Sequence, residues 1–371
     1  MARISNYLLC AKGNCILILR ILAIHSTKVL LSPWVSIMKI SASVYSSKGT
    51  DLEALINDLD QHGIDYFHID CNDDPSVFED IEHIKQWSKT PIDLHLITAN
   101  PEQYFDRINQ VGVDLVTLQH EELNGYQYRG GLNARMGLSI VSDTDISAFE
   151  ADAEFYDFVL MMATVPGQSG GKFDKTNFRK IRAFKKAFPG KAIHVDGGVN
   201  AEVSFILRNM GVSSSVVGSY LFKNQPLGAA LLNLKTHDVE SHYVVKDFMR
   251  SREEIPLVGP AHQHLKDVLQ SIEDYKLGFT ILENEDETLV GIVSNADLRR
   301  EMLKNIEQPQ AISLSNMINK SPIVIEENST VKAMLQKVKQ FDFPINYLPV
   351  VDSENKVTGV VSFLNLVKGE L

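Results

Sequence analysis

The segment AIHVDGGVN, residues 192–200, shows the unit that recurs through the first half of this chain. A short apolar run ends in Asp196, two glycines follow, and residues 201–210 then have the apolar spacing of an amphipathic helix. Outward from this unit, strand-like runs occur at residues 38–44, 66–71, 92–97, 115–118, 136–141, 158–163 and 215–217. Helical spacing occurs at residues 52–62, 81–87, 101–111 and 177–187, and a compressed helix is expected within 122–133.

Eight strand–helix units in succession predict the α/β class and a closed (β/α)8 TIM barrel over residues 38–230. The alternative is an open, doubly wound parallel sheet. No dinucleotide-binding glycine pattern follows the first strand, which disfavours that alternative.

The second half of the chain repeats itself with an offset of 68 residues, because Met249 matches Met317 and GIVS at 291–294 matches GVVS at 359–362. Each copy has the order helix, strand, helix, two strands, helix. Copies of this size cannot each bury a large core, so they should pack as a pair. We expect an α+β pair over residues 242–371, with copies at 242–305 and 312–371, after a polar linker near 230–241.

The charge distribution separates a leader from the body of the chain. The whole chain has 36 basic and 47 acidic residues, a net charge of −11, whereas residues 1–37 hold four basic residues and no acidic one. An acidic body argues against nucleic-acid binding, which requires a basic face. Arg20 interrupts the apolar stretch of the leader, which is therefore too short to span a membrane. We place the leader outside the fold and interpret it as sequence translated upstream of the true start, as a transit segment or as an ordered extension. Three cysteines argue against a disulfide framework and favour the cytoplasm.

Ionisable side chains stand at the ends of three predicted strands. His68 and Asp70 share one strand face, His95 ends another strand, and Asp196 precedes two glycines. Strand ends of a barrel converge at one mouth, where two His and two Asp can bind one divalent metal ion. The other interpretation is that these histidines are structural.

Glycine-rich loops follow the last three strands. They contain Gly167 and Gly170, then Gly197 and Gly198, then Gly218 with Ser219. Glycine lets backbone amides approach a ligand closely, and loops seven and eight of barrels commonly bind phosphate. Ordinary turn glycines remain the alternative.

From residue 38 to about 222 the chain resembles the ribulose-phosphate 3-epimerase family. The matching stretches, in the family's order, are MKISASVYSS at 38–47, HID at 68–70, DLHL at 93–96, VPGQSGGKF at 165–173, VDGGVN at 195–200 and VGSYLF at 217–222.

The resemblance implies one divalent metal ion (Zn²⁺, Fe²⁺, Mn²⁺ or Co²⁺) on His68, Asp70, His95 and Asp196. It makes Asp70 and Asp196 the two acid/base carboxylates. It also implies a substrate site that contains Ser43, Met162, Gly167, Gly170, Gly197, Gly198, Gly218 and Ser219. The implied reaction converts D-ribulose 5-phosphate to D-xylulose 5-phosphate.

Several positions depart from the family pattern. Asn72-Asp73-Asp74 replaces a Met-Asp-Gly run, and the covering loop is shortened to residues 75–79. Ile97 replaces a methionine, and Gln119 replaces the histidine of the fourth strand. We therefore weigh two alternatives: an epimerase of another phosphoketose such as allulose 6-phosphate, and a sensor without catalytic activity.

The repeated half resembles a tandem pair of CBS domains. In that family a G-x-x-S/T-x-x-D run contacts the ribose of an adenine nucleotide, which here corresponds to Gly291, Ser294 and Asp297. The second copy has Asn365 at the Asp position. Arg299 and Arg300 are candidates for phosphate contacts or for a solvated helix face. The resemblance implies a regulatory role and a homo-oligomer. The acidic net charge and the interrupted apolar leader argue against nucleic acid and a membrane as partners.

Overall fold

The computed structural model describes residues 38–164, 170–223, 226–235, 242–338, 340–341 and 345–363. Residues 37–371 form one compact unit. The expected leader, Gly167, the linker residues 236–241, and the last helix with Asn365 lie outside the described residues.

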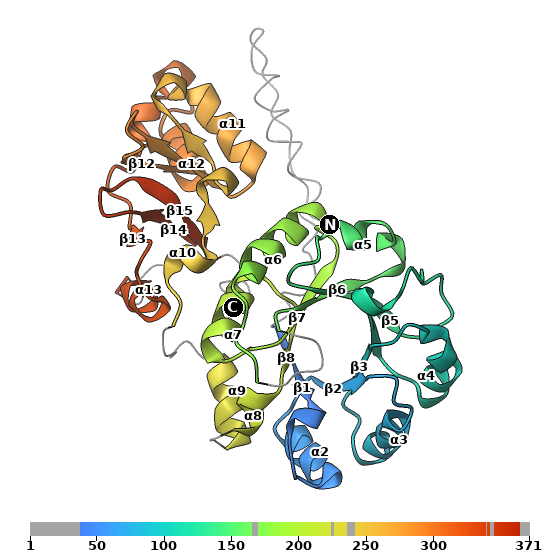
Figure 1. Cartoon of the computed structure of the whole chain (residues 1–371). Coiled ribbons are helices and arrows are strands. Elements are labelled where there is room, and N and C mark those ends of the chain that lie inside the picture. Colours follow the sequence, from blue (N-terminus) through green and yellow to red (C-terminus); the bar gives the residue numbers. More distant parts are fainter. Residues whose placement is uncertain are drawn as a thin grey trace, which may run out of the picture. The chain divides into compact units, whose positions relative to one another are not determined.

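The first part of the described chain is a closed barrel of eight parallel strands (Figure 1). Its strands are β1 (Lys39–Ser43), β2 (Tyr66–Cys71), β3 (Ile92–Leu96), β4 (Leu115–Gln119), β5 (Arg135–Val141), β6 (Phe158–Met162), β7 (Ala192–Asp196) and β8 (Ser214–Val217). Each strand pairs with the next along the chain, and β1 closes the barrel on β8 through Ser41 and Val216. The predicted barrel is confirmed, with every strand within one residue of its expected bounds.

Helices cover the outside of the barrel. They are α2 (Leu52–Gln61), α3 (Val77–Trp87), α4 (Phe105–Val111), α5 (Ser147–Glu150), α6 (Thr176–Ala187), α7 (Ala201–Met210), α8 (Ser219–Phe222) and α9 (Leu227–Lys235). The helix expected over 101–111 is split, because a 3-10 turn at Pro101–Tyr104 precedes α4.

Two sequence predictions for these connections are wrong. The structure has a 3-10 turn, His120–Glu122, and no α-helix between β4 and β5, where Gly125, Gly130 and Gly131 have positive φ. Helix α3 begins at Val77, four residues before the predicted start at residue 81, because Val77 and Phe78 are buried. The connection from β2 to α3 is therefore residues 72–76.

Three helix-to-strand connections share one short pattern. Residues 63–65 (GID), 112–114 (GVD) and 211–213 (GVS) each follow a helix. The glycines have φ values of 65°, 71° and 78°, a left-handed conformation that ends helices and favours glycine. The apolar residue that follows is buried in each case. The pattern thus stops the helix and returns the chain to the barrel.

Aspartates in front of β2, β4 and β6 bind the neighbouring strand. Each carboxylate accepts a bond from a backbone N–H at the start of the preceding strand: Ile40 to Asp65, Ile92 to Asp114 and Met136 to Asp157, at 2.9, 2.9 and 3.0 Å. These strand-linking aspartates fix the amino-terminal ends of neighbouring strands against one another.

Large side chains fill the amino-terminal end of the barrel. Tyr66, Leu115 and Phe158 pack together there, and the ring of His194 stacks on Phe158 at 4.1 Å. A Cβ at Gly137 would overlap the Phe158 ring, so this position requires glycine. Packed side chains therefore occupy this end of the barrel interior.

The second part of the chain contains two sheets, β10-β11-β12 and β13-β14-β15-β9. Their strands are β9 (Arg250–Ser251), β10 (Leu257–Val258), β11 (Phe279–Glu283), β12 (Leu289–Ser294), β13 (Ile325–Glu326), β14 (Tyr347–Val351) and β15 (Val357–Ser362). The helices are α10 (Val245–Phe248), α11 (Leu265–Tyr275), α12 (Asn295–Lys304) and α13 (Val331–Val338). This is the predicted α+β pair. The first copy has two short strands, β9 and β10, where one was expected, and the second copy opens on a 3-10 turn, Leu314–Asn316, in place of the expected first helix.

The two copies exchange backbone segments. Strand β9, from the first copy, pairs with β15 of the second, and Asn319 of the second copy exchanges two backbone bonds with Ile292 of the first, at 2.9 and 3.0 Å. A Cβ at Gly291 would meet the Asn319 carbonyl at 2.6 Å, and one at Gly359 would overlap the Arg250 carbonyl. The repeated glycine is therefore required by the crossing segment of the other copy.

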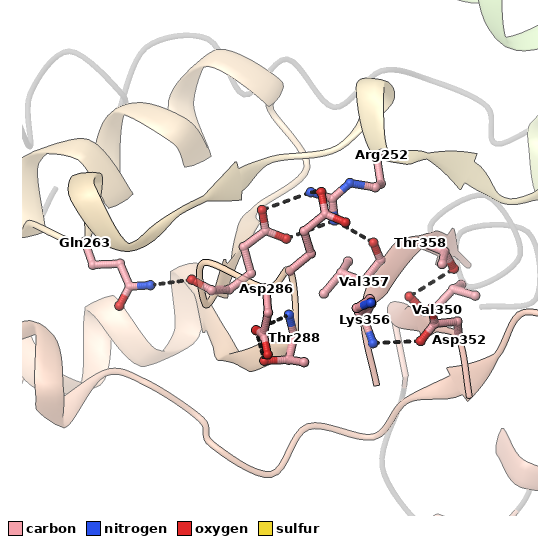
Figure 2. Close-up of polar contacts among 11 residues, drawn as sticks. Arg252, Gln263, Asp286, Thr288, Val350, Asp352, Lys356, Val357 and Thr358 are labelled. Carbon is pink, nitrogen blue, oxygen red and sulfur yellow. Dashed lines mark hydrogen bonds and ion pairs between the residues drawn. The ribbon is translucent and has the colours of Figure 1, made fainter. Parts of the chain in front are cut away.

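Polar contacts also join the two copies (Figure 2). The guanidinium of Arg252, in the first copy, donates to the carbonyl of Val357, in the second, at 2.6 Å. Glu283 of the first copy holds this guanidinium with both carboxylate oxygens, at 2.9 and 3.0 Å. The hairpin turns at Glu287 and Asn355, both with positive φ, exchange backbone bonds with the other copy. The two copies therefore form one folded unit.

The CBS-like part contacts helix α6 of the barrel. Arg182 donates from Nε to both oxygens of Glu254, at 3.0 and 3.1 Å, and from Nη1 to the carbonyl of Phe248 at 3.1 Å. The ring of Tyr243 packs edge-on against Phe178, with centroids 5.7 Å apart.

None of the helices in the described ranges is long and apolar enough to cross a membrane.

Candidate active site

A cavity of about 110 Å³ opens at the carboxyl end of the barrel strands. Its lining combines predicted site residues with neighbours from the same loops: Ser43, Tyr45, Ser46, Asp70, Met162, Thr164, Gly170, Asp196, Gly197, Gly198, Val199, Val216, Gly218 and Ser219.

The four predicted metal ligands converge beside this cavity. His68, His95 and Asp196 each have a ligand atom within 4.8 Å of the others. Asp70 Oδ1 lies 3.3 Å from both His68 Nε2 and His95 Nδ1. Strand register produces this arrangement, because Asp70 and His95 are direct partners on β2 and β3.

The donor set fits a divalent cation. His68 Nε2 and His95 Nδ1 are buried, and neither has a hydrogen-bond partner among the described residues. Unsatisfied nitrogens are costly in a protein interior, and here both face the two carboxylates. Imidazole nitrogens and carboxylate oxygens are ligands for Zn²⁺ and other transition ions.

A buried aspartate orients His68. Asp93 Oδ2 lies 3.0 Å from His68 Nδ1 and accepts a bond from the hydroxyl of Ser41 at 2.9 Å. Burial would raise the pKa of Asp93, but His68 outweighs it and holds that pKa below its ordinary value. An ionised carboxylate only accepts hydrogen bonds, so Nδ1 of His68 carries a proton and Nε2 faces the cluster. Carboxylates commonly orient metal-binding histidines in this way.

The two cluster carboxylates have opposite pKa shifts. Burial raises the pKa of Asp196 to about 6, and Asp70 adds to the rise while His68 and His95 oppose it. Burial would also raise the pKa of Asp70, but His68 and His95 outweigh it and hold that pKa well below its ordinary value. Burial would lower the pKa of His68, but Asp93 and Asp70 raise it well above its ordinary range. Opposed shifts of this kind are typical of an acid–base pair.

The glycine loops form one wall of the cavity. Gly197 and Gly198 have φ values of 106° and 66°, and a Cβ on either would overlap Thr164 or the backbone of Phe173. A Cβ at Gly218 would overlap the side chain of Ser46. Backbone therefore lines this wall.

The remaining predicted substrate residues take definite places. Met162 is buried at the cavity floor and packs with Leu160 and Val216. The hydroxyl of Ser43 lies 3.0 Å from that of Ser46. Gly170 lines the cavity, whereas Gly167 lies outside the described residues.

Sequence reasoning missed several residues of the site. Asp93 and Ser41 were not predicted, although strand alternation places Asp93 on the same face as His95. Thr164 lines the cavity from a loop, and Tyr45 and Ser46 line it from a 3-10 turn, Val44–Ser46. Neither segment has a periodic pattern that marks inward-facing positions.

In the CBS-like part, Ser294 and Asp297 form a helix cap at the start of α12. Asp297 Oδ2 accepts bonds from the backbone N–H and the hydroxyl of Ser294, at 2.9 and 2.5 Å. Arg300 Nη1 donates to Asp297 Oδ1 at 2.9 Å, from an exposed side chain. Gly291, the third residue of the predicted set, packs against Asn319.

Comparisons with known proteins match both parts of the chain. A sequence model of the ribulose-phosphate 3-epimerase family matches residues 39–222, and one of the CBS domain matches residues 245–304 and 314–370. The ribulose-phosphate 3-epimerase of Aquifex aeolicus is 29% identical over 189 residues, which cover 47% of this chain and 85% of that protein. The enzyme of the same name from Methanocaldococcus jannaschii is 27% identical over 227 residues, 57% of this chain and 95% of that protein.

Among solved structures, the CBS-pair protein CBSX2 from Arabidopsis thaliana is 26% identical, with coverage of 34% of this chain and 92% of that chain and a TM-score of 0.28. Family models thus match both parts of the chain. Residues 39–222 belong to the ribulose-phosphate 3-epimerase family, a family of isomerases, and the same chain continues into a tandem pair of CBS domains.

Proposed function

We propose that the barrel is a metal-dependent 3-epimerase of a phosphorylated ketose, with D-ribulose 5-phosphate and D-xylulose 5-phosphate as its substrate pair. One observation carries this proposal. Asp70 and Asp196 stand beside the cavity on β2 and β7, with opposite pKa shifts, next to two histidine nitrogens without hydrogen-bond partners among the described residues.

His68, Asp70, His95 and Asp196 would hold the metal ion. When bound, a divalent ion would supply a Lewis acid that stabilises negative charge on the substrate's oxygens. Asp93 and Gln119 would keep the two imidazoles in place, because each has an oxygen within 3.0 Å of the ring nitrogen that faces away from the cluster.

The two carboxylates would carry out the proton transfers. Inversion of a carbon beside a carbonyl requires removal of its proton on one face, to give an enediolate, and return of a proton on the other face. One carboxylate takes the proton and the second delivers one, and the roles exchange in the reverse direction. In the metal-free site burial raises the pKa of Asp196 above its ordinary value, which favours a carboxyl group that can both take and return a proton.

Backbone amides would bind the substrate phosphate. Gly197, Gly198 and Gly218 line the cavity with Ser219, and the first three have no room for a side chain. Ser43, Met162, Gly167 and Gly170 would complete the substrate site. Binding through amides suits an acidic protein, because it requires no basic patch.

A second candidate substrate class follows from the connection between β2 and α3. Only residues 72–76 join these two elements, so little chain lies over that side of the cavity. We propose, as the alternative, that another phosphoketose such as allulose 6-phosphate is accepted there.

For the CBS pair we propose an adenine nucleotide at Gly291, Ser294 and Asp297, with a regulatory effect on the barrel. A ribose would compete with Ser294 for Asp297 Oδ2, which links binding to the cap of α12. We also propose a homo-oligomer and, because cysteine is scarce, a cytoplasmic location. We propose domain limits of 38–230 and 242–371, which contain the matched ranges.

The decisive experiment is a phosphoketose panel with metal-loaded protein. Each ketose, including ribulose 5-phosphate and allulose 6-phosphate, is incubated with protein and Zn²⁺, Fe²⁺, Mn²⁺ or Co²⁺, and its epimer is measured. No epimer from any ketose contradicts the proposal.

The variant Asp196→Asn tests the combined role of Asp196 in metal binding and proton transfer. We expect a loss of about a hundredfold or more in turnover, because an amide cannot shuttle the proton. Circular dichroism should show an unchanged fold. Asp157→Asn, at the opposite end of the barrel, is the control and should keep its activity.

A further inference from the structure

Glu121 lies just after β4, at the rim of the barrel, and joins the end of β4 to the end of β5 and the turn that follows it. One carboxylate oxygen accepts bonds from the backbone N–H of Val141, at 3.0 Å, and from the hydroxyl of Thr144. The other accepts a bond from the side-chain amide of Gln119. Burial would raise the pKa of Glu121, but these bonds outweigh it and lower that pKa, so the group is an ionised acceptor at neutral pH.

The acceptor character of Glu121 determines how the Gln119 amide is oriented. An amide has a donor end and an acceptor end, and a buried glutamine can in principle present either one to a neighbour. Since Glu121 can only accept, the NH₂ group of Gln119 must face it. Gln119 Oε1 then faces His95 Nε2, 2.9 Å away.

The orientation of Gln119 in turn determines the tautomer of His95. A carbonyl oxygen accepts, so His95 Nε2 must carry the proton. A neutral imidazole has one N–H, so the lone pair is on Nδ1. Nδ1 is the atom that lies 3.3 Å from Asp70 and has no hydrogen-bond partner among the described residues.

His68 and His95 differ in how the position of the ring proton is fixed. His68 is oriented by a carboxylate, Asp93, which can only accept. His95 is oriented by a neutral amide, which needs a third residue to fix it. We propose that Glu121 is a positioning residue that acts through Gln119 to keep the lone pair of His95 on Nδ1, toward the metal ligands. This inference rests on the proposed metal site for its purpose, but the tautomer itself is independent of any metal.

The variant Glu121→Gln should reverse the chain of bonds. The backbone N–H of Val141 is a fixed donor, so the new amide keeps its oxygen there and turns its NH₂ toward Gln119. Gln119 then accepts from residue 121 and donates to His95 Nε2. His95 must carry its proton on Nδ1 instead, where it blocks the cluster.

Exchanging the two residues should restore the original tautomer. In Gln119→Glu/Glu121→Gln, the carboxylate at position 119 can only accept, so His95 Nε2 donates again, and the amide at 121 donates to it. This double variant has the same composition as the wild-type chain. Glu122→Gln is the matched control, because Glu122 is the exposed next residue and lies outside this chain of bonds.

Long-range ¹⁵N–¹H NMR of the full-length, metal-free protein reads the tautomer directly, at a pH where imidazoles are neutral. The His95 signals are assigned from their loss in His95→Gln. We expect Nε2–H in wild type, Glu122→Gln and the double variant, and Nδ1–H in Glu121→Gln. An Nδ1–H in wild type, or an unchanged tautomer in Glu121→Gln, would overturn the proposal.

Chelator competition with Co²⁺ or Zn²⁺ gives a second readout. We expect Glu121→Gln to bind the ion about 10–100-fold more weakly and the double variant to recover this loss. Equal affinity in Glu121→Gln and wild type counts against the role of Glu121. If wild type binds no ion at all, the proposed function fails, and the NMR result alone decides the proposal on Glu121.

Discussion

At the scale of single residues, the site depends on groups that do not themselves face the cavity. His68 and His95 each use one ring nitrogen for a supporting residue and leave the other for the cluster, but they use opposite nitrogens. The four cluster residues could be predicted, because each stands at the end of a strand and alternation fixes its direction. The supporting bonds join residues on different strands, so they depend on strand register, which the sequence alone does not reveal.

Asp93→Asn tests the support of His68. The amide oxygen can still accept from His68 Nδ1, but the negative charge that strengthens this bond is lost. We expect Co²⁺ affinity, measured by chelator competition, to fall about tenfold or more. Asp65→Asn removes a charge from the other end of the barrel and should leave affinity unchanged. Equal affinity of Asp93→Asn and wild type would show that Asp93 does not support the site.

At the scale of elements, local patterns predict the strands more accurately than the connections. A strand buried on both faces is a continuous apolar run, so its ends are visible in the sequence. The segment between β4 and β5 was expected to contain a helix, yet its glycines adopt left-handed conformations that a helix cannot use. The triplets at 63–65, 112–114 and 211–213 show that a helix end is predictable where a left-handed glycine and a buried apolar residue occur together.

The strand-linking aspartates should contribute stability without affecting the site. Asp114→Ala leaves the N–H of Ile92 without its acceptor, at the start of β3. We expect the free energy of unfolding, measured by urea denaturation, to fall by about 1 kcal/mol. Metal affinity should not change, because the bond is at the far end of the barrel.

Lys89→Ala, at an exposed position just before β3, is the control for this effect. It should stay within about 0.5 kcal/mol of wild type. If Asp114→Ala is as stable as Lys89→Ala, the aspartate bond makes no contribution to barrel stability.

At the scale of the whole molecule, the contact between Arg182 and Glu254 links the barrel to the CBS pair. The two residues are 72 positions apart and belong to different domains, so no periodic pattern in the sequence indicates that they meet. Both side chains are largely shielded from solvent, with exposed fractions of 13% and 28%. The domains themselves were predictable, but the surfaces by which they contact each other were not.

This ion pair should make the stability of the protein depend on pH. Burial would raise the pKa of Glu254, but Arg182 outweighs it, so the pKa is below the ordinary 4.5. A depressed carboxyl pKa stabilises the folded state above the ordinary value, and the effect is lost as the pH falls through the lowered one. Glu254→Gln should therefore be about 2 kcal/mol less stable than wild type at neutral pH, and the difference should shrink in acid.

Thermal unfolding across a pH series measures this difference. Glu82→Gln removes an exposed carboxylate that pairs with Arg107 at 2.9 Å, and it should change stability by less than about 0.5 kcal/mol at any pH. A Glu254→Gln deficit that is the same at acidic and neutral pH would show that the loss does not come from the ion pair.

The exchanged segments of the CBS pair also bear on the order in which the chain is made. The first copy is synthesised before the second. Strand β9 and Ile292 of the first copy can therefore pair with β15 and Asn319 only after the second copy has been made. The barrel has no such dependence, because its last strand, β8, closes on β1 before either copy emerges from the ribosome. We therefore expect a nascent chain to contain a folded barrel followed by a first CBS copy that is not yet fully folded. A ribosome stalled between the two copies would leave the edge of β9 exposed, because its partner β15 is not yet synthesised.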